Sequence, residues 1–142
     1  MLGSRYLGVD TLKQGMPWWK VLGNELLTKL GNWMMGSNFA ESHTGYQAFS
    51  RRTWEEIPFA LNSDNFAFDQ EMLVPATHLG FTMIEVPVPT NYLPEASNAS
   101  RVDSIIYGWS ILFLLGRFIV HRIPLIELRQ FQSFISRHRR VQ

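Results

Sequence analysis

The sequence predicts an α/β fold in which short strands alternate with helices. Three observations support this prediction. Residues 1–7 look like the end of a strand that runs into a glycine-rich loop at 8–15, apolar residues recur at helical spacing between 17 and 35, and residues 81–88 alternate as in a strand. Strands and helices that alternate along a chain are typical of an α/β sandwich around one core.

The first helix is expected from Pro17 to Met35. Proline suits the first turn of a helix, because an N–H at that position would have no partner within the helix. Apolar residues then repeat every three or four positions, and the polar run Gly36-Ser37-Asn38 ends the pattern.

Smaller elements are expected in the middle of the chain, where turn-forming residues are frequent. Gly80 is suited to the residue that follows a helix, because glycine adopts a left-handed conformation at little cost. The predicted elements are a polar loop at 39–44, a strand-like stretch at 45–50, one helical turn at 51–56 before Pro58, a cap or turn cluster at Asn62-Ser63-Asp64, and a second helix from Phe68 to Leu79.

The last third of the chain is predicted to hold one strand and one long helix. Residues 81–88 form the strand, and Pro87 and Pro89 confine its end to a sheet edge. After a polar loop at 92–100, an aromatic-rich helix is expected from Arg101 to His121. Pro124 interrupts it, and a short basic helix is expected to follow.

Composition and charge exclude several classes of protein. The chain has 142 residues, of which 46% are hydrophobic and 18% charged, so it is globular rather than disordered. It has no cysteine, which excludes disulfides, thiolate zinc sites and a cysteine nucleophile. Residues 1–116 carry 7 basic and 11 acidic side chains, net −4, whereas residues 117–142 carry 6 basic and 1 acidic, net +5. These basic residues are few and terminal, so nucleic acid is not an expected partner.

The long helix and the basic end predict contact with a membrane surface. The longest uncharged apolar run is Ser104–Gly116, 13 residues, whereas a spanning helix needs about 20. We therefore expect this chain to touch a membrane rather than cross it by itself. An apolar helix followed by arginines fits an interfacial segment on anionic lipid. The alternative is a core helix with a solvated tail.

Two segments contain groups suited to binding phosphate or activating an acceptor. Arg5 follows Gly3-Ser4 and precedes a helix that carries Lys20, and arginine and helix N-termini both bind phosphate. The loop from Glu41 to Arg51 combines an acid, an imidazole and hydroxyl groups, as a general-base site would. A serine triad is not supported, because Gly-x-Ser-x-Gly is absent. The alternatives are a turn with a surface arginine in the first segment and an ordinary loop in the second.

Three acids lie close together at the start of the second helix: Asp64, Asp69 and Glu71. Asp69 and Glu71 are about 200° apart around a helix, so only one of them can face a given site. The other is expected to be solvated or to interact with the helix dipole. An oxygen-only Mg²⁺ or Mn²⁺ site stays open as an alternative, as does simple helix capping.

Taken in order, these segments resemble the C-terminal half of family-two inverting glycosyltransferases, especially the dolichyl- or polyprenyl-phosphate sugar synthases. The resemblance covers about residues 1 to 117. It rests on Gly3-Ser4-Arg5-Tyr6, Leu22-Gly23-Asn24, His43 to Arg51, Ile57-Pro58-Phe59, Asn62-Ser63-Asp64, Phe66 to Asp69, Gly80-Phe81, Glu85 to Thr90, Tyr92 and Glu95-Ala96-Ser97.

The resemblance implies a partial GT-A fold, a Rossmann-like nucleotide-sugar transferase fold that lacks its N-terminal half. Residues 1–100 would then be the acceptor-side part of the catalytic domain, and 101–142 an amphipathic helix with a basic tail. The family's Asp-x-Asp metal motif is absent from this sequence. The resemblance therefore implies a divalent metal, Mg²⁺ or Mn²⁺, with ligands mostly in the missing half and none assigned in this chain.

The resemblance also implies roles for individual residues. Glu41 and Asp69 are the catalytic candidates, and Arg5 and Lys20 the contacts to donor phosphate. Gln47 stands where the family commonly has arginine, which puts a charged contact there in doubt. The implied acceptor-binding residues are His43, Thr44, Gly45, Tyr46, Gln47, Asp64 and Arg101.

The implied function is transfer of a sugar from a nucleotide-sugar donor. The acceptor would be a polyprenyl or dolichyl phosphate or another cell-envelope glycan acceptor, and the protein would be peripheral on the cytoplasmic face of the membrane. We expect the isolated chain to be inactive, because the metal motif is missing. The alternative is a non-enzymatic module, derived from the same fold, that binds a membrane surface or a partner.

Overall fold

The computed structural model describes residues 1–8, 15–89, 101–124 and 126–134. All three long predicted helices form, and their ends lie within a residue of the predicted ones. Most of the loops predicted at 8–15 and 92–100, and the last eight residues of the basic tail, lie outside the described residues. The elements are β1 (Leu2–Ser4), α1 (Trp18–Met35), α2 (Arg51–Glu56), the 3-10 turn η1 (Phe59–Leu61), α3 (Phe68–His78), β2 (Glu85–Pro87), α4 (Arg101–His121) and the 3-10 turn η2 (Arg129–Phe131).

β1 pairs with β2 in parallel, with Gly3 opposite Val86. On its other side β1 meets the chain around Gln47 in an isolated antiparallel bridge. Gly3 N–H donates to the carbonyl oxygen of Tyr46 at 2.8 Å. Two predicted strands are therefore shorter than expected: 45–50 contributes one bridge, and only the Glu85–Pro87 part of 81–88 is a strand.

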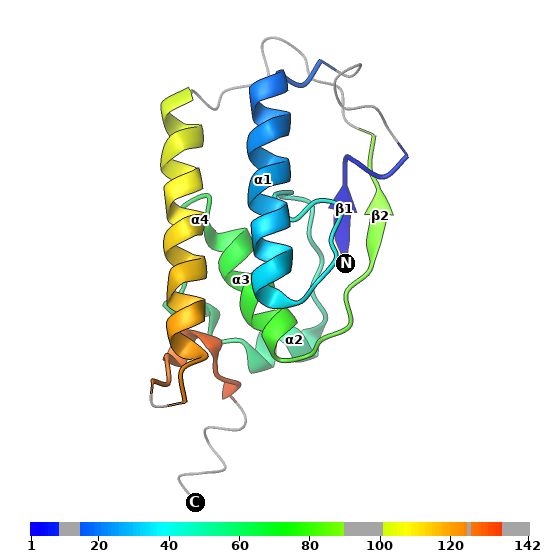
Figure 1. Ribbon diagram of the computed structural model, residues 1–142. Coiled ribbons are helices and arrows are strands. Elements are labelled where there is room, and N and C mark those ends of the chain that lie inside the picture. The colour runs from blue at the N-terminus through cyan, green and yellow to red at the C-terminus, as the bar shows by residue number, and fades with distance from the viewer. Residues whose placement is uncertain (9–14, 90–100, 125, 135–142) are drawn as a thin grey trace, which may run out of the picture.

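The helices lie on one side of this small sheet. Figure 1 shows α1 between the sheet and α4, with α1 and α4 side by side and their N-terminal ends at the same end of the molecule. α3 packs against both of these helices. The left-handed Gly36 ends α1, and the positive φ of Gly80 ends the turn after α3, as predicted.

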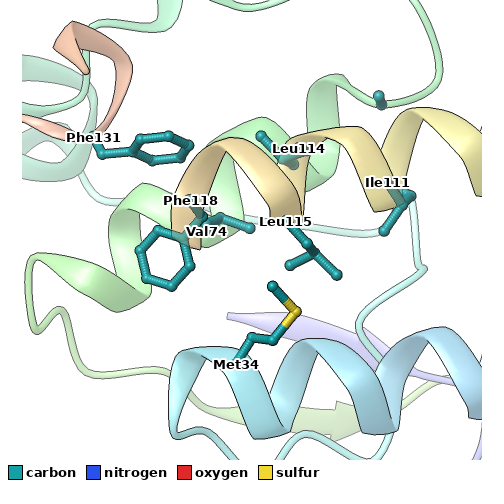
Figure 2. Packing of buried hydrophobic residues seen from close by; sticks show 8 residues of the cluster. Met34, Val74, Ile111, Leu114, Leu115, Phe118 and Phe131 are labelled. Atoms are coloured by element: carbon teal, nitrogen blue, oxygen red, sulfur yellow. The ribbon is translucent and has the colours of Figure 1, made fainter. Parts of the chain in front are cut away.

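The main core lies where α4, α3 and the end of α1 meet. One face of α4 is buried there at a spacing of three and four residues, which is the period of a helix. Figure 2 shows these side chains pointing toward Met34 of α1, Val74 of α3 and Phe131 of η2. The buried α4 residues are Ile111, Leu114, Leu115 and Phe118.

The segment after Pro124 begins with a 3-10 turn rather than with the predicted short basic helix, whereas Phe134 is helical and the basic residues that follow it lie outside the described ones. Its described part contains the three-residue turn η2, in which Gln130 and Phe131 are buried. The Phe131 ring packs at an edge angle on Phe118, with centroids 5.5 Å apart. Phe131 therefore anchors this segment against Phe118 of α4 and the core.

Helix α4 is longer and more apolar than its uncharged run alone suggested. The stretch Val102–His121 has the length and composition of a membrane-crossing helix, yet only 22% of it is buried inside the protein. The rest of α4 exposes large apolar side chains, among them Val102, Ile106, Trp109 and Phe113. Helix α4 therefore contributes one face to the core and leaves many apolar side chains exposed.

Gly3 leaves no room for a side chain in the sheet, which gives a first prediction. A Cβ at Gly3 would lie 2.6 Å from Cδ1 of Tyr46 and 2.7 Å from Cγ2 of Val88. We expect Gly3→Ala to lower the free energy of unfolding by about 1–3 kcal/mol, the usual cost of overpacking. Urea denaturation followed by circular dichroism measures this change. Gly116→Ala is the control, because its Cβ meets nothing within 4 Å; equal stability of the Gly3 variant and the parent would contradict the prediction.

Candidate functional site

An open cavity of about 520 Å³ lies between α1, the N-terminal part of α4 and the loop that follows α1. It brings together residues that are far apart in the sequence. Six of the residues singled out from the sequence line it: Arg5, Lys20, His43, Thr44, Gly45 and Asp69. Both predicted phosphate-binding cations and one of the two predicted catalytic carboxylates therefore share one space.

Glu41 holds Arg5 in place by accepting its hydrogen bonds. Glu41 is fully buried, and one of its carboxylate oxygens accepts hydrogen bonds from Nε (2.7 Å) and Nη2 of Arg5. The other oxygen accepts the backbone N–H of Arg5 at 2.7 Å. Arg5 Nη2 also donates to the carbonyl oxygen of His43 at 3.0 Å. Glu41 does not line the cavity, and the structure places it as the partner that orients Arg5.

The loop that carries Glu41 is hydrogen-bonded to β2 and to α3. The Glu85 carboxylate, from β2, accepts the backbone N–H groups of Ala40 and Glu41 at 2.9–3.1 Å. The Ser42 carbonyl oxygen accepts a hydrogen bond from Gln70 Nε2 of α3. These hydrogen bonds connect the loop to segments that lie 28 to 45 residues away in the sequence.

His43 connects this loop to α4. Its Nδ1 atom lies 2.9 Å from the hydroxyl oxygen of Tyr107, and the two rings meet edge to face with centroids 5.7 Å apart. Burial, with the positive charge of Arg5, lowers the pKa of His43 to about 4, so the ring is neutral at pH 7. Its Nε2 atom is buried and has no hydrogen-bond partner in the described part of the chain.

Asp69 is the carboxylate that faces the cavity near the loop. One of its oxygens lies 3.6 Å from the position that a Cβ on Gly45 would take. Partial burial raises the pKa of Asp69 above that of an ordinary aspartate. A carboxylate beside a cavity with a raised pKa is suited to accept a proton from a bound ligand.

Glu71 behaves only in part as predicted. The expectation that the second carboxylate is solvated is wrong, because Glu71 is buried, whereas its position in the first turn of α3 agrees with the helix-dipole alternative. Its carboxylate accepts hydrogen bonds from the backbone N–H and the hydroxyl of Ser63, at 2.5 and 2.9 Å. The turn at 62–64 is thereby fastened to α3, and Glu71 points away from Asp69 as the helical spacing required.

The other predicted acceptor residues lie elsewhere. Tyr46 is exposed and covers Gly3, Gln47 donates to the carbonyl oxygen of Thr44 at 3.0 Å, and Asp64 is exposed. None of these three lines the cavity. The side chain of Arg101 lies outside the described residues.

Several lining residues were not singled out as site residues from the sequence. Tyr107, Ser104 and Asp103 of α4 line the cavity with Trp19 of α1. Desolvation, with the negative charge of Asp69 next, raises the pKa of Tyr107. Residues 103, 104 and 107 recur at three- and four-residue spacing, so they share a helix face. That spacing marks a polar strip on an otherwise apolar helix, which is the sequence signal that could have identified them.

Within the described ranges, no three histidine, aspartate or glutamate side chains gather as metal ligands would. Asp69 and Asp103 both line the cavity, and Glu71 is engaged with Ser63.

The comparisons with known proteins point to one class of enzyme. A protein of Methanocaldococcus jannaschii is 33% identical over 114 residues, which are 80% of this chain and 46% of that protein. The low-salt glycan biosynthesis hexosyltransferase Agl6 of Haloferax volcanii is 31% identical over 108 residues, 76% of this chain and 25% of that enzyme. The polyprenol monophosphomannose synthase of Mycolicibacterium smegmatis is 26% identical over 88 residues, 61% of this chain and 33% of that enzyme.

No family model matches the chain, and no solved structure matches it. The chain spans less than half the length of each of these relatives. Relatives named as a hexosyltransferase, a phosphomannose synthase and a glycosyltransferase support a glycosyltransferase family for this chain.

Proposed function

We propose that this chain forms the acceptor side of an inverting glycosyltransferase of the GT-A type. The enzyme takes a sugar from a nucleotide-sugar donor and transfers it to a lipid phosphate, such as polyprenyl or dolichyl phosphate, or to another cell-envelope glycan acceptor. One observation carries the proposal. A single cavity holds the cations Arg5 and Lys20 with the carboxylate Asp69, and it opens between two helices that expose apolar side chains.

The two cations are suited to a diphosphate leaving group. Arg5 is held by three hydrogen bonds to Glu41, so its guanidinium is oriented before a ligand arrives. Lys20 lies on the first turn of α1 with its Nζ 5.3 Å from the ring centroid of Trp19. Preorganised positive groups stabilise the negative charge that develops on the departing phosphate.

Asp69 is the proposed general base. The acceptor oxygen forms a bond to the anomeric carbon of the sugar, and the bond from that carbon to the diphosphate oxygen breaks through an oxocarbenium-like state. When the acceptor is a hydroxyl group, its proton passes to the Asp69 carboxylate. A phosphate acceptor is already anionic, and Asp69 then accepts whatever proton the phosphate retains.

A divalent metal belongs to this proposal, although the described residues gather no ligand set for it. Bound to the donor diphosphate, Mg²⁺ or Mn²⁺ would neutralise negative charge on the leaving group. Because the sequence has no Asp-x-Asp pair, we assign the metal ligands to a nucleotide-binding part of the enzyme. For the same reason we expect the 142-residue chain by itself to transfer no sugar.

The membrane contact is proposed from exposed apolar side chains on α1 and α4. These two helices lie side by side (Figure 1). Trp18 and Trp33, near the two ends of α1, are 70% and 79% exposed, and Phe113 of α4 is 71% exposed. Six arginines follow from residue 117 onward. Apolar helices beside a basic segment fit the cytoplasmic face of an anionic bilayer.

A flotation experiment tests the membrane contact. We expect the chain to float with anionic liposomes and less with zwitterionic ones. The double variant Trp109→Glu and Phe113→Glu is expected to lose most of this binding, because it puts two charges into the exposed stripe of α4. The matched control places glutamate at Ile84 and Leu61, which are also exposed but lie on neither helix. Equal flotation of both double variants would contradict the proposed surface.

A transfer experiment separates the enzyme from the alternative, a non-enzymatic membrane-binding module. Residues 1–142 replace the matching part of the Mycolicibacterium smegmatis polyprenol monophosphomannose synthase, and transfer of mannose to polyprenyl phosphate is followed by mass spectrometry of the lipid. We expect the chimaera to transfer mannose and the 142-residue chain alone to transfer none. A folded chimaera that binds liposomes without any transfer would favour the module.

A further inference from the structure

Gly23 occupies a position in α1 where glycine has no conformational or packing reason to be. It lies in the interior of an 18-residue helix, where glycine is the poorest helix former apart from proline. A Cβ added at Gly23 would meet nothing within 4 Å. By contrast, a Cβ at Gly31 would contact Met35, and a Cβ at Gly108 would contact Leu27. No described neighbour therefore requires position 23 to lack a side chain.

The empty space beside Gly23 belongs to the cavity. Gly23 lines it together with Trp19 and Leu27, which lie one turn away on either side along the same face of α1. Ile105 of α4 and Met16 also line the cavity and add apolar surface. Gly23 thus leaves a notch in an apolar wall, where ligand atoms can approach the helix backbone.

A positive charge lies next to this notch. Lys20 also lines the cavity and precedes Gly23 by three residues, so it lies about one helical turn away on the same face. A ligand whose anionic group lies near Lys20 can therefore reach the notch with the atoms attached to that group. The apolar walls favour hydrocarbon there rather than a sugar.

We infer that Gly23 is a specificity-determining residue that admits the first hydrocarbon segment of a lipid-phosphate acceptor. The inference rests on the proposed function and deepens it. The anionic head of the acceptor lies among the charged residues of the cavity, and the chain attached to it passes over the backbone of α1 at Gly23. A side chain at position 23 would occupy this path without disturbing the fold.

Binding of two probes to three proteins tests this inference. Farnesyl phosphate carries head and hydrocarbon, whereas inorganic phosphate carries the head alone. The proteins are the parent chain, Gly23→Leu and Gly116→Leu. Gly116 is the matched control, because it is also a helix-interior glycine with open space at its Cβ and it does not line the cavity. Calorimetry measures the binding of farnesyl phosphate, at concentrations below its aggregation limit. Phosphorus NMR measures the binding of inorganic phosphate.

We expect Gly23→Leu to weaken farnesyl phosphate binding at least tenfold and to change phosphate binding less than twofold. Gly116→Leu should change neither. Both leucine variants should melt no lower than the parent, because leucine is a better helix former than glycine. Unchanged farnesyl phosphate binding by Gly23→Leu would overturn the role of Gly23 alone, and so would equal weakening of both probes. A parent chain that binds inorganic phosphate but not farnesyl phosphate would overturn the lipid-phosphate acceptor, and the inference with it.

Discussion

Replacing Glu41 with glutamine is expected to lower the free energy of unfolding by about 3–5 kcal/mol, the usual cost of breaking a buried ion pair from one side. Glu41 is fully buried and accepts three hydrogen bonds from Arg5, whose side chain is only 20% exposed. Glutamine keeps the size of the side chain but removes the charge, and it turns part of the acceptor into a donor. Arg5 then stays largely buried after losing the charge of the carboxylate that accepts three of its hydrogen bonds, and domains of this size are stable by only about 5–15 kcal/mol.

Urea denaturation of the parent and the Glu41→Gln variant at pH 7 measures this loss. Glu25→Gln is the matched control, because Glu25 pairs with Lys29 on the surface of α1 at 3.2 Å. Exposed pairs of this spacing contribute about 0.5 kcal/mol or less. The double variant Glu41→Leu with Arg5→Met should recover much of the lost stability, because no charge is then left unpaired. A Glu41→Gln variant as stable as the control would show that Glu41 is not the structural partner of Arg5.

Replacing Asp69 with asparagine is expected to lower transfer of mannose to polyprenyl phosphate by the chimaeric enzyme about 10²–10⁴-fold, the usual contribution of a general base. Asparagine keeps the shape of the side chain but accepts no proton at neutral pH. The acidic limb of the pH–rate profile, set by the raised pKa of Asp69, should vanish in the variant. Glu55→Gln on α2 is the activity control, because Glu55 pairs with Arg51 away from the cavity.

The same variant should raise stability at neutral pH. Burial raises the pKa of Asp69 in the folded state, so the folded protein binds this proton more tightly than the unfolded chain. The contribution of Asp69 to stability is therefore full below its ordinary pKa and is lost as the pH rises through the raised pKa. The melting temperature of Asp69→Asn should exceed that of the parent at pH 7 and approach it near pH 3. A variant that lost activity and also melted lower at pH 7 would point to a structural rather than a catalytic carboxylate.

The sequence by itself determined the long helices and several of the residues that line the cavity. Pro17 and Gly36 mark the two ends of α1, because proline and glycine restrict or relax the backbone conformation only within one or two residues of themselves. The apolar period defined α4, including the stripe that packs into the core. Arg5 and Asp69 were identified from residue type and order, and both line the cavity. Such signals are local, so they survive in a single sequence.

Only the tertiary structure shows how these groups are arranged. Glu41 and Asp69 were equivalent candidates in the sequence, and only the contact across 36 residues between Arg5 and Glu41 separates the buried partner from the carboxylate in the cavity. Tyr107 reaches His43 across 64 residues, and the space beside Gly23 is part of a cavity that α1 and α4 line together. The local pattern defines which face of a helix is apolar or polar. Which face meets which depends on contacts between distant segments, and these form only when the whole chain packs.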